Sequence, residues 1–229
     1  MARQRLGRSL AEDVYDSLRC DILFGRRVPG SRIQLRELAD EHGVSLSVVR
    51  EAVTRLAGED LVEATPQRGF RVRSLSVADL RDLTWARVQI ETLVLRESIA
   101  KGDVNWEADV VSAHHRLAGT PTQLADGSPN LEWMGVHAAY HNALCSAGGS
   151  PTLERVRRQL FDASELYRYW SATLPARTVR GSAADEHREI CDAALARDTE
   201  RAVELLTAHL NATAQQLEAV AMVTPFDSS

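Results

Sequence analysis

The chain has 229 residues, which exceeds one typical domain, and a formal net charge of −5 at pH 7. No apolar run approaches the length of a membrane span or resembles a signal peptide, so we expect a cytoplasmic protein of two domains without membrane contact. The three cysteines, Cys20, Cys145 and Cys191, lie too far apart to indicate a disulfide framework or a Cys-x-x-Cys metal knuckle.

Two short helices joined by a sharp turn are predicted between residues 35 and 56. Gly43 suits the turn, and Ser45 is placed to cap the second helix. The outer face of that helix carries Ser47, Arg50, Glu51 and Thr54 at helical spacing, so it could enter the major groove of DNA. The inner faces carry the apolar positions Leu35, Leu38, Ala39, Val49, Ala52, Val53 and Leu56.

A β-hairpin is predicted next, with residues 61–64 and 70–73 on either side of a turn at 65–69. Arg68 would lie at its tip, and Gly69 would let the backbone approach a phosphate closely. Arg71 and Arg73 would add positive charge along the same edge. The alternative interpretation is an ordinary small helical subdomain with solvated arginines.

A net positive charge is confined to the first third of the chain. Residues 1–75 contain 13 arginines and 11 acidic residues, whereas the remainder contains 14 basic and 21 acidic residues. Only the N-terminal part is therefore suited to binding phosphates.

These features resemble the GntR family of bacterial transcription regulators, in particular its FadR-like branch. The resemblance implies a winged helix-turn-helix, and it implies that this unit binds double-stranded DNA. Leu46 occupies a contact position where the family usually has arginine, and Val48 stands where it often has proline or threonine. The matching stretches are Leu10 to Phe24, residues 25–33, Arg36-Glu-Leu-Ala, Gly43-Val-Ser, Val49-Arg50-Glu51-Ala52 and Arg68-Gly69-Phe70-Arg-Val72. The DNA contacts carried over from the family are Arg36, Ser45, Leu46, Ser47, Arg50, Arg68 and Gly69.

The rest of the chain is expected to be an all-helical bundle, which makes the whole protein mainly α. Ser76 is predicted to cap the first helix of this bundle, with Asp79 at the third helical position. We therefore place a winged helix-turn-helix domain at residues 1–75 and a helical domain at 76–229. Helical apolar spacing covers 76–101, 104–118, 130–147, 151–174, 178–197 and 198–222.

Four histidines of the helical domain are predicted to point inward. His137 and His141 are four residues apart on one helix, so both imidazoles can reach one point, and His187 and His209 fall on the apolar stripes of later helices. Neutral imidazoles suit zinc, nickel, copper or iron. The alternative is four independent core histidines, each hydrogen-bonded to a carbonyl group.

This region resembles the FadR C-terminal (FCD) ligand-binding domain. Tyr140-His141-Asn-Ala-Leu144, Gly148-Gly149-Ser-Pro151, Glu186-His187 and His209-Leu210 carry the resemblance. It implies a divalent transition metal, zinc first and nickel as the alternative, held by His137, His141, His187 and His209. His137 takes the place of an acidic ligand of the family.

Arg87 falls on the inward stripe of its helix, where an unpaired guanidinium would be costly. Its anionic partner could be Glu91, one turn later, in a purely structural pair. It could equally be the carboxylate of an effector, as the family's arginine at the matching position implies.

We therefore expect a homodimeric transcription regulator, acting as a repressor, that binds operator DNA of two-fold symmetry. A small organic acid bound at the metal would control its DNA affinity, and a compact hydroxy, keto or dicarboxylic acid fits a polar metal site better than a fatty acyl-CoA. The alternatives are a histidine-ligated metalloenzyme, against which the lack of a His-Glu-x-x-His sequence argues, and a regulator with a purely structural metal.

Overall fold

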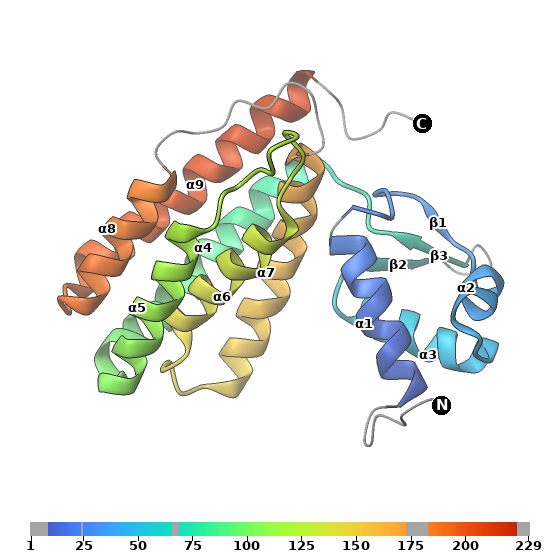
Figure 1. The fold of residues 1–229 in the computed structure, drawn as a ribbon, viewed down its shortest axis with the longest axis horizontal. Coiled ribbons are helices and arrows are strands. Elements are labelled where there is room, and N and C mark those ends of the chain that lie inside the picture. The colour runs from blue at the N-terminus through green and yellow to red at the C-terminus, as the bar shows by residue number, and fades with distance from the viewer. Residues whose placement is uncertain (1–8, 24, 66–68, 173–182, 224–229) are drawn as a thin grey trace.

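The computed structural model describes residues 9–23, 25–65, 69–172 and 183–223. Figure 1 shows two lobes, one with three helices around a small sheet and one built only from helices. This arrangement confirms the predicted mainly-α fold, with a winged helix-turn-helix followed by a helical bundle. Among the described residues, no helix is long and apolar enough to cross a membrane.

The smaller lobe contains α1 (Leu10–Leu23), α2 (Leu35–His42) and α3 (Leu46–Gly58). Gly43 ends α2 in a left-handed conformation with φ of 64°, as the sharp turn requires. The predicted apolar positions of α3 are fully buried and pack against α1, which buries Leu18 and Ile22. Helix α2 buries Leu38 and Ala39 in the same apolar cluster and packs against α3, so the two predicted helices meet through the faces that their apolar spacing indicates.

The wing is a three-stranded antiparallel sheet of β1 (Arg32–Ile33), β2 (Val62–Thr65) and β3 (Gly69–Val72), in the order β1-β3-β2. Val62 pairs with Val72 in the expected hairpin. The additional strand β1 was not predicted, because two residues are too few to show alternation and pair only with the distant β3.

The junction between the lobes is packed. Ser76 caps α4 (Val77–Lys101), since its hydroxyl accepts a hydrogen bond from the Asp79 amide at 3.0 Å, as predicted. The apolar core of the smaller lobe also continues across residue 75 onto Leu80, Leu83 and Leu166. The expected division at residue 75 thus lies at a shared core rather than at an open linker.

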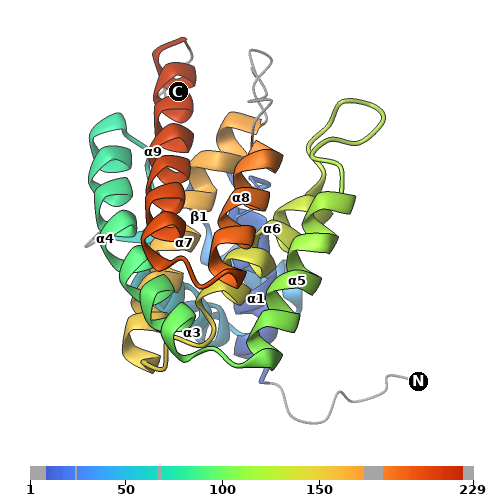
Figure 2. The same ribbon diagram turned by 90° about the vertical axis from the view of Figure 1, so that its left-hand side faces the viewer.

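The larger lobe continues with α5 (Val104–Gly119), α6 (Leu131–Cys145), α7 (Pro151–Ala172), α8 (Ala183–Leu195) and α9 (Thr199–Val223). Helix α4 packs against α7 and α9, α5 packs against α6, and α8 packs against α9 (Figure 2). Asp198 caps α9 by accepting a hydrogen bond from the Arg201 amide. The first five residues of the helix predicted at 178–197 lie outside the described residues.

Candidate functional site

Three helices bring four histidines together in the core of the larger lobe. His137 and His141 come from α6, His187 from α8 and His209 from α9. All four are between 0% and 3% exposed, and one ring nitrogen from each lies within 4.8 Å of the others. The four residues predicted from spacing therefore form one cluster.

The spacing within the cluster fits metal coordination. The Nε2 atoms of His137 and His141 are 3.1 Å apart. Two imidazole nitrogens bound to one tetrahedral zinc ion would lie about 3.4 Å apart, given zinc–nitrogen bonds of about 2.0–2.1 Å. The four nitrogens lie within 4.8 Å of one another, so the farther ones would move closer together to bind one ion.

Several nitrogens of the cluster lack any other partner. The Nε2 atoms of His187 and His209 and the Nδ1 atom of His137 are buried without a hydrogen-bond partner among the described residues. An unpaired buried polar atom is costly, and a metal ion would satisfy the two Nε2 atoms. These orphaned nitrogens argue against four histidines that are each satisfied by a carbonyl group.

The environment of the cluster keeps the imidazoles neutral. Burial is the largest cause that lowers the pKa of each histidine, and the pKa of His187 falls to about 2. The positive charge of Arg168 lowers the four pKa values further. Neutral imidazole is the form that binds a metal, so the site needs little proton release before it can hold an ion.

Glu186 orients one of the histidines, a role that the sequence did not reveal. Its Oε2 atom lies 2.9 Å from Nδ1 of His209. A carboxylate that accepts a hydrogen bond from Nδ1 leaves the lone pair of Nε2 available, which is how carboxylates support metal-bound histidines. Similarly, the Tyr140 hydroxyl donates to the His187 carbonyl oxygen at 2.7 Å and fixes α6 against α8.

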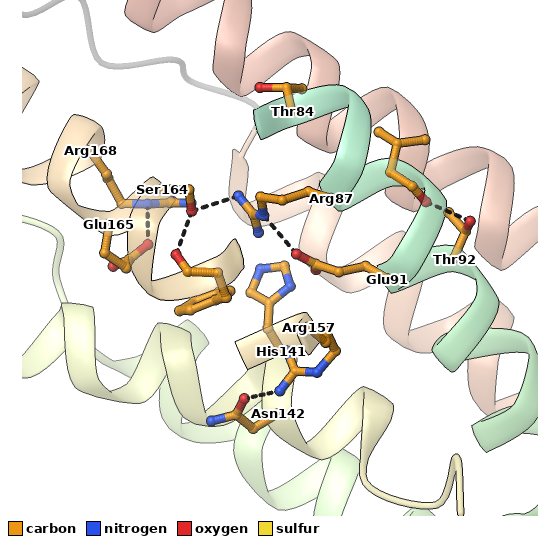
Figure 3. A network of polar contacts seen from close by, with 12 residues as sticks. Thr84, Arg87, Glu91, Thr92, His141, Asn142, Arg157, Ser164, Glu165 and Arg168 are labelled. Atoms are coloured by element: carbon orange, nitrogen blue, oxygen red, sulfur yellow. Dashed lines mark hydrogen bonds and ion pairs between the residues drawn. The ribbon is translucent and has the colours of Figure 1, made fainter. Parts of the chain in front are cut away.

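A buried arginine lies beside the cluster (Figure 3). Nε of Arg87 is 2.6 Å from Oε1 of Glu91, and its Nη1 donates to the Ser164 hydroxyl at 2.8 Å. The Glu91 pair that the sequence offered as the structural alternative is thus present. Nη2 of Arg87 nevertheless remains buried without a hydrogen-bond partner among the described residues.

A second arginine, which the sequence analysis did not single out, approaches the same cluster from α7. Nη1 of Arg168 lies 3.3 Å from Nε2 of His137, and its Nε is 2.8 Å from Oε1 of Glu165. Burial raises the pKa of the Glu165 carboxyl group. The four-residue spacing places Ser164 and Arg168 on one face of α7, but it does not indicate that this face lines the cluster.

The predicted DNA contacts that the structure describes are exposed. Arg36 lies on α2, Leu46, Ser47 and Arg50 on α3, and Gly69 on the wing, and all are exposed. Leu46 is 45% exposed, so its side chain is available for contact with another molecule. Arg68 lies outside the described residues.

Two expectations about this surface need correction. Ser45 occupies the N-cap position of α3, but its hydroxyl makes no cap hydrogen bond and instead lies 2.8 Å from the Ser47 hydroxyl. Arg73 does not extend the charged edge of the wing, because it pairs with Asp79 at 2.9 Å at the junction of the lobes. Arg71 is exposed and donates to the Gly30 carbonyl oxygen.

Comparison with known proteins assigns both lobes. Residues 10–72 match the model of the bacterial regulatory proteins of the gntR family, and residues 82–212 match the FCD domain. The HTH-type transcriptional regulator BphR of Paraburkholderia xenovorans is 39% identical over 90% of this chain and 84% of its own length. The HTH-type transcriptional repressor GlaR of Escherichia coli is 34% identical over 86% of this chain and 91% of its own length.

Solved structures share the same architecture. The structure of E. coli McbR/YncC superposes with a TM-score of 0.77 at 20% identity and covers 93% of this chain and 99% of its own. A transcriptional regulator of Rhodococcus sp. RHA1 superposes with a TM-score of 0.75 at 26% identity and covers 91% and 97%. At 20% identity, the similarity to McbR/YncC supports only the shared fold.

Proposed function

The chain belongs to the GntR family of transcriptional regulators and carries an FCD domain, and we propose that it is a repressor controlled by a small organic acid bound at a metal centre. The convergence of His137, His141, His187 and His209 carries this proposal. Members of this family bind operator DNA, so the proposal concerns what controls that binding.

A divalent transition metal is the group that this donor set fits. Four imidazoles with borderline softness suit zinc, with nickel as the alternative, and Glu186 supports His209 as a metal-bound histidine requires. Because all four ligands are neutral, a bound ion keeps its full double charge. When bound, the ion would attract an anionic oxygen, which makes a carboxylate the natural effector group.

Arg87 supports the same class of ligand. Its Nε and Nη1 atoms are held by Glu91 and Ser164, so the guanidinium is fixed in orientation, while Nη2 has no partner among the described residues. A fixed guanidinium with a spare donor is suited to a carboxylate oxygen. We therefore assign Arg87 to effector binding in addition to its pair with Glu91.

DNA binding is assigned to Arg36, Ser45, Leu46, Ser47, Arg50, Arg68 and Gly69. We propose that the protein acts as a homodimer, because an operator of two-fold symmetry is matched by two such surfaces. If the acid binds more tightly to a dimer whose DNA-binding surfaces do not match the operator, the acid lowers the affinity for DNA, and DNA lowers the affinity for the acid by the same factor.

The test begins with operator fragments selected from a DNA library by the purified, zinc-loaded protein. Release of the selected DNA by organic acids is then measured with zinc present and after chelation. The proposal requires release that depends on zinc. If acids release DNA equally well after chelation, the metal is structural, and if no acid releases DNA, effector control by this class is wrong.

The FCD match and the family relatives do not support the alternative function as a metalloenzyme, since the family consists of transcription regulators.

A further inference from the structure

We propose that Arg168 is a second anion-binding group of the effector site, so that the effector carries two anionic groups, as a dicarboxylate does. The inference rests on the proposed function, because it specifies the class of organic acid that the site selects. It concerns a residue on α7 that lies outside the histidine cluster and outside the pair of Arg87 and Glu91.

The position of Arg168 makes it part of the site. Its side chain is 15% exposed, and its Nη1 atom reaches Nε2 of His137 at 3.3 Å. Ser164, which holds Nη1 of Arg87, lies one helical turn earlier on α7. Figure 3 shows Arg87 extending from α4 toward Ser164, with Glu165 and Arg168 on the same helix. Both guanidiniums are thus anchored on one face of α7.

The contact between Arg168 and His137 cannot persist in a metal-loaded site that uses the same nitrogen. An imidazole nitrogen has a single lone pair, which can accept a hydrogen bond or bind a metal but cannot do both. The nitrogen in question is Nε2 of His137, which also faces Nε2 of His141 at 3.1 Å. A metal held there would leave Nη1 of Arg168 without its present acceptor.

A donor released in this way needs a new acceptor. The Arg168 side chain is only 15% exposed, so an anionic oxygen in place of the lost acceptor is favoured. Glu165 already engages the opposite side of the same guanidinium, at Nε. Nη2 of Arg87 is the other spare donor. Two spare donors on two separate guanidiniums beside the histidine cluster favour an effector with more than one carboxylate.

The alternative is that Arg168 only stabilises α7 through its pair with Glu165, three residues earlier. In that case Arg168 would contribute to folding but would not distinguish one acid from another. A comparison of two ligand classes on one variant therefore separates the two roles.

The experiment uses the zinc-loaded full chain and isothermal titration calorimetry. The ligands are linear dicarboxylates of three to six carbons, each paired with the monocarboxylate of equal chain length. We expect at least one dicarboxylate to bind wild-type protein more tightly than its partner. Arg168→Gln should weaken that dicarboxylate by at least about tenfold, the equivalent of one charge-assisted hydrogen bond, and should leave the monocarboxylate unchanged.

Two controls keep the result interpretable. Arg158→Gln removes an arginine from the same helix whose side chain is 62% exposed, and it should change neither affinity. Zinc affinity, measured by competition with a chromophoric chelator, should stay equal or rise in Arg168→Gln, because a competing cation has been removed. Arg168→Lys keeps the charge in case the glutamine variant does not fold, and it should also lose the preference for dicarboxylates.

The outcomes separate this inference from the proposed function. If monocarboxylates bind wild-type protein as tightly as dicarboxylates, or if Arg168→Gln weakens both classes equally, the assignment of Arg168 is wrong while acid control stands. A sharp loss of zinc affinity in Arg168→Gln would show a structural role instead. If no acid of either class binds wild-type protein, the proposed function fails, and this inference fails with it.

Discussion

The Tyr167 hydroxyl donates a hydrogen bond to Oδ2 of Asp79 at 2.9 Å, and it thereby joins the helix that lines the histidine cluster to the start of α4 at the junction of the lobes. The same hydroxyl also contacts the backbone of Ser76. On another face of α7, Asp162 pairs with Arg19 of α1 in the DNA-binding lobe. One helix therefore contacts the cluster, the junction and the first helix of the DNA-binding unit.

Tyr167→Phe tests whether this connection matters for control. The substitution keeps the buried ring but removes the hydroxyl. The free energy of unfolding, measured by urea denaturation, should therefore fall by about 1 kcal/mol. We also expect the acid that releases DNA to have a smaller effect on operator affinity, while its affinity for the DNA-free protein changes little. DNA release by that acid, measured by fluorescence anisotropy, checks this expectation. If the acid lowers the operator affinity of Tyr167→Phe by the same factor as that of wild-type protein, Tyr167 does not couple acid binding to DNA binding.

Arg50→Ala tests the DNA-binding surface. Arg50 is exposed on α3 and makes no ion pair among the described residues, so its loss should remove a phosphate or base contact without harming the fold. We expect operator binding in a mobility-shift assay to weaken by more than tenfold, about 1.4 kcal/mol or more. Arg116→Ala, which removes an exposed arginine of the helical lobe, is the matched control and should bind normally. Equal binding by both variants would contradict the placement of α3 in the groove.

Leu46→Arg should change which operators are preferred. Leu46 is exposed on the proposed DNA-binding face and can offer only an apolar contact, for example to a thymine methyl group, whereas arginine pairs with guanine. Selection from a randomised DNA library should therefore yield a different consensus for the variant. The same consensus for variant and wild-type protein would show that position 46 does not read bases.

Much of the fold was predictable because its signals are local. The i, i+3, i+4 spacing of α3, the turn at Gly43 and the Ser76 cap each depend on a few neighbouring residues, and all were confirmed. Strand β1 was not predictable, because it exists only through its pairing with β3. Ser45 shows the limit even for a local rule, since its hydroxyl turns to Ser47 instead of the helix amides.

The candidate site was predictable only in its inward histidines. Their spacing indicated that each points to the core, and His137 and His141 had to lie together because they share one helix face. The support of His209 by Glu186 depends on how α8 packs against α9, and the approach of Arg168 to His137 depends on how α7 lies against α6. No spacing within one helix contains that information. The contacts of Arg87 were predictable only in part, because its pair with Glu91 lies within one helix whereas its contact with Ser164 joins two helices.

Glu186→Ala tests the proposed metal centre through its supporting carboxylate. The loss of the acceptor for Nδ1 of His209 should lower zinc affinity by about 10- to 100-fold, as is typical when a metal-bound histidine loses such support. Zinc affinity is measured by chelator competition. Glu189→Ala removes an exposed carboxylate of the same helix and should leave that affinity unchanged. His187→Ala combined with His209→Ala should abolish stoichiometric zinc, and full zinc content in that double variant would rule out the site.

The stability of the chelated protein should depend on pH through the buried histidines. Their pKa values in the folded protein are lowered, mainly by burial, whereas an unfolded histidine titrates near 6.5. Below pH 6.5 the unfolded chain therefore binds more protons than the folded protein. The free energy of unfolding is unaffected by these groups above pH 6.5. It falls by about 1.4 kcal/mol per pH unit for each histidine that stays neutral as the pH drops below that value.

His187→Asn isolates one of these contributions. The pKa of His187 falls to about 2, so this residue should stay neutral in the folded protein throughout the range from pH 6.5 to 5. Urea denaturation of the chelated variant should show a weaker pH dependence than wild-type protein, by about 1.4 kcal/mol per pH unit below pH 6.5. His115→Asn, at an exposed position, is the matched control and should keep the wild-type slope. If His187→Asn keeps that slope as well, His187 is not held neutral by burial, and the argument that the cluster is ready to bind a metal loses its basis.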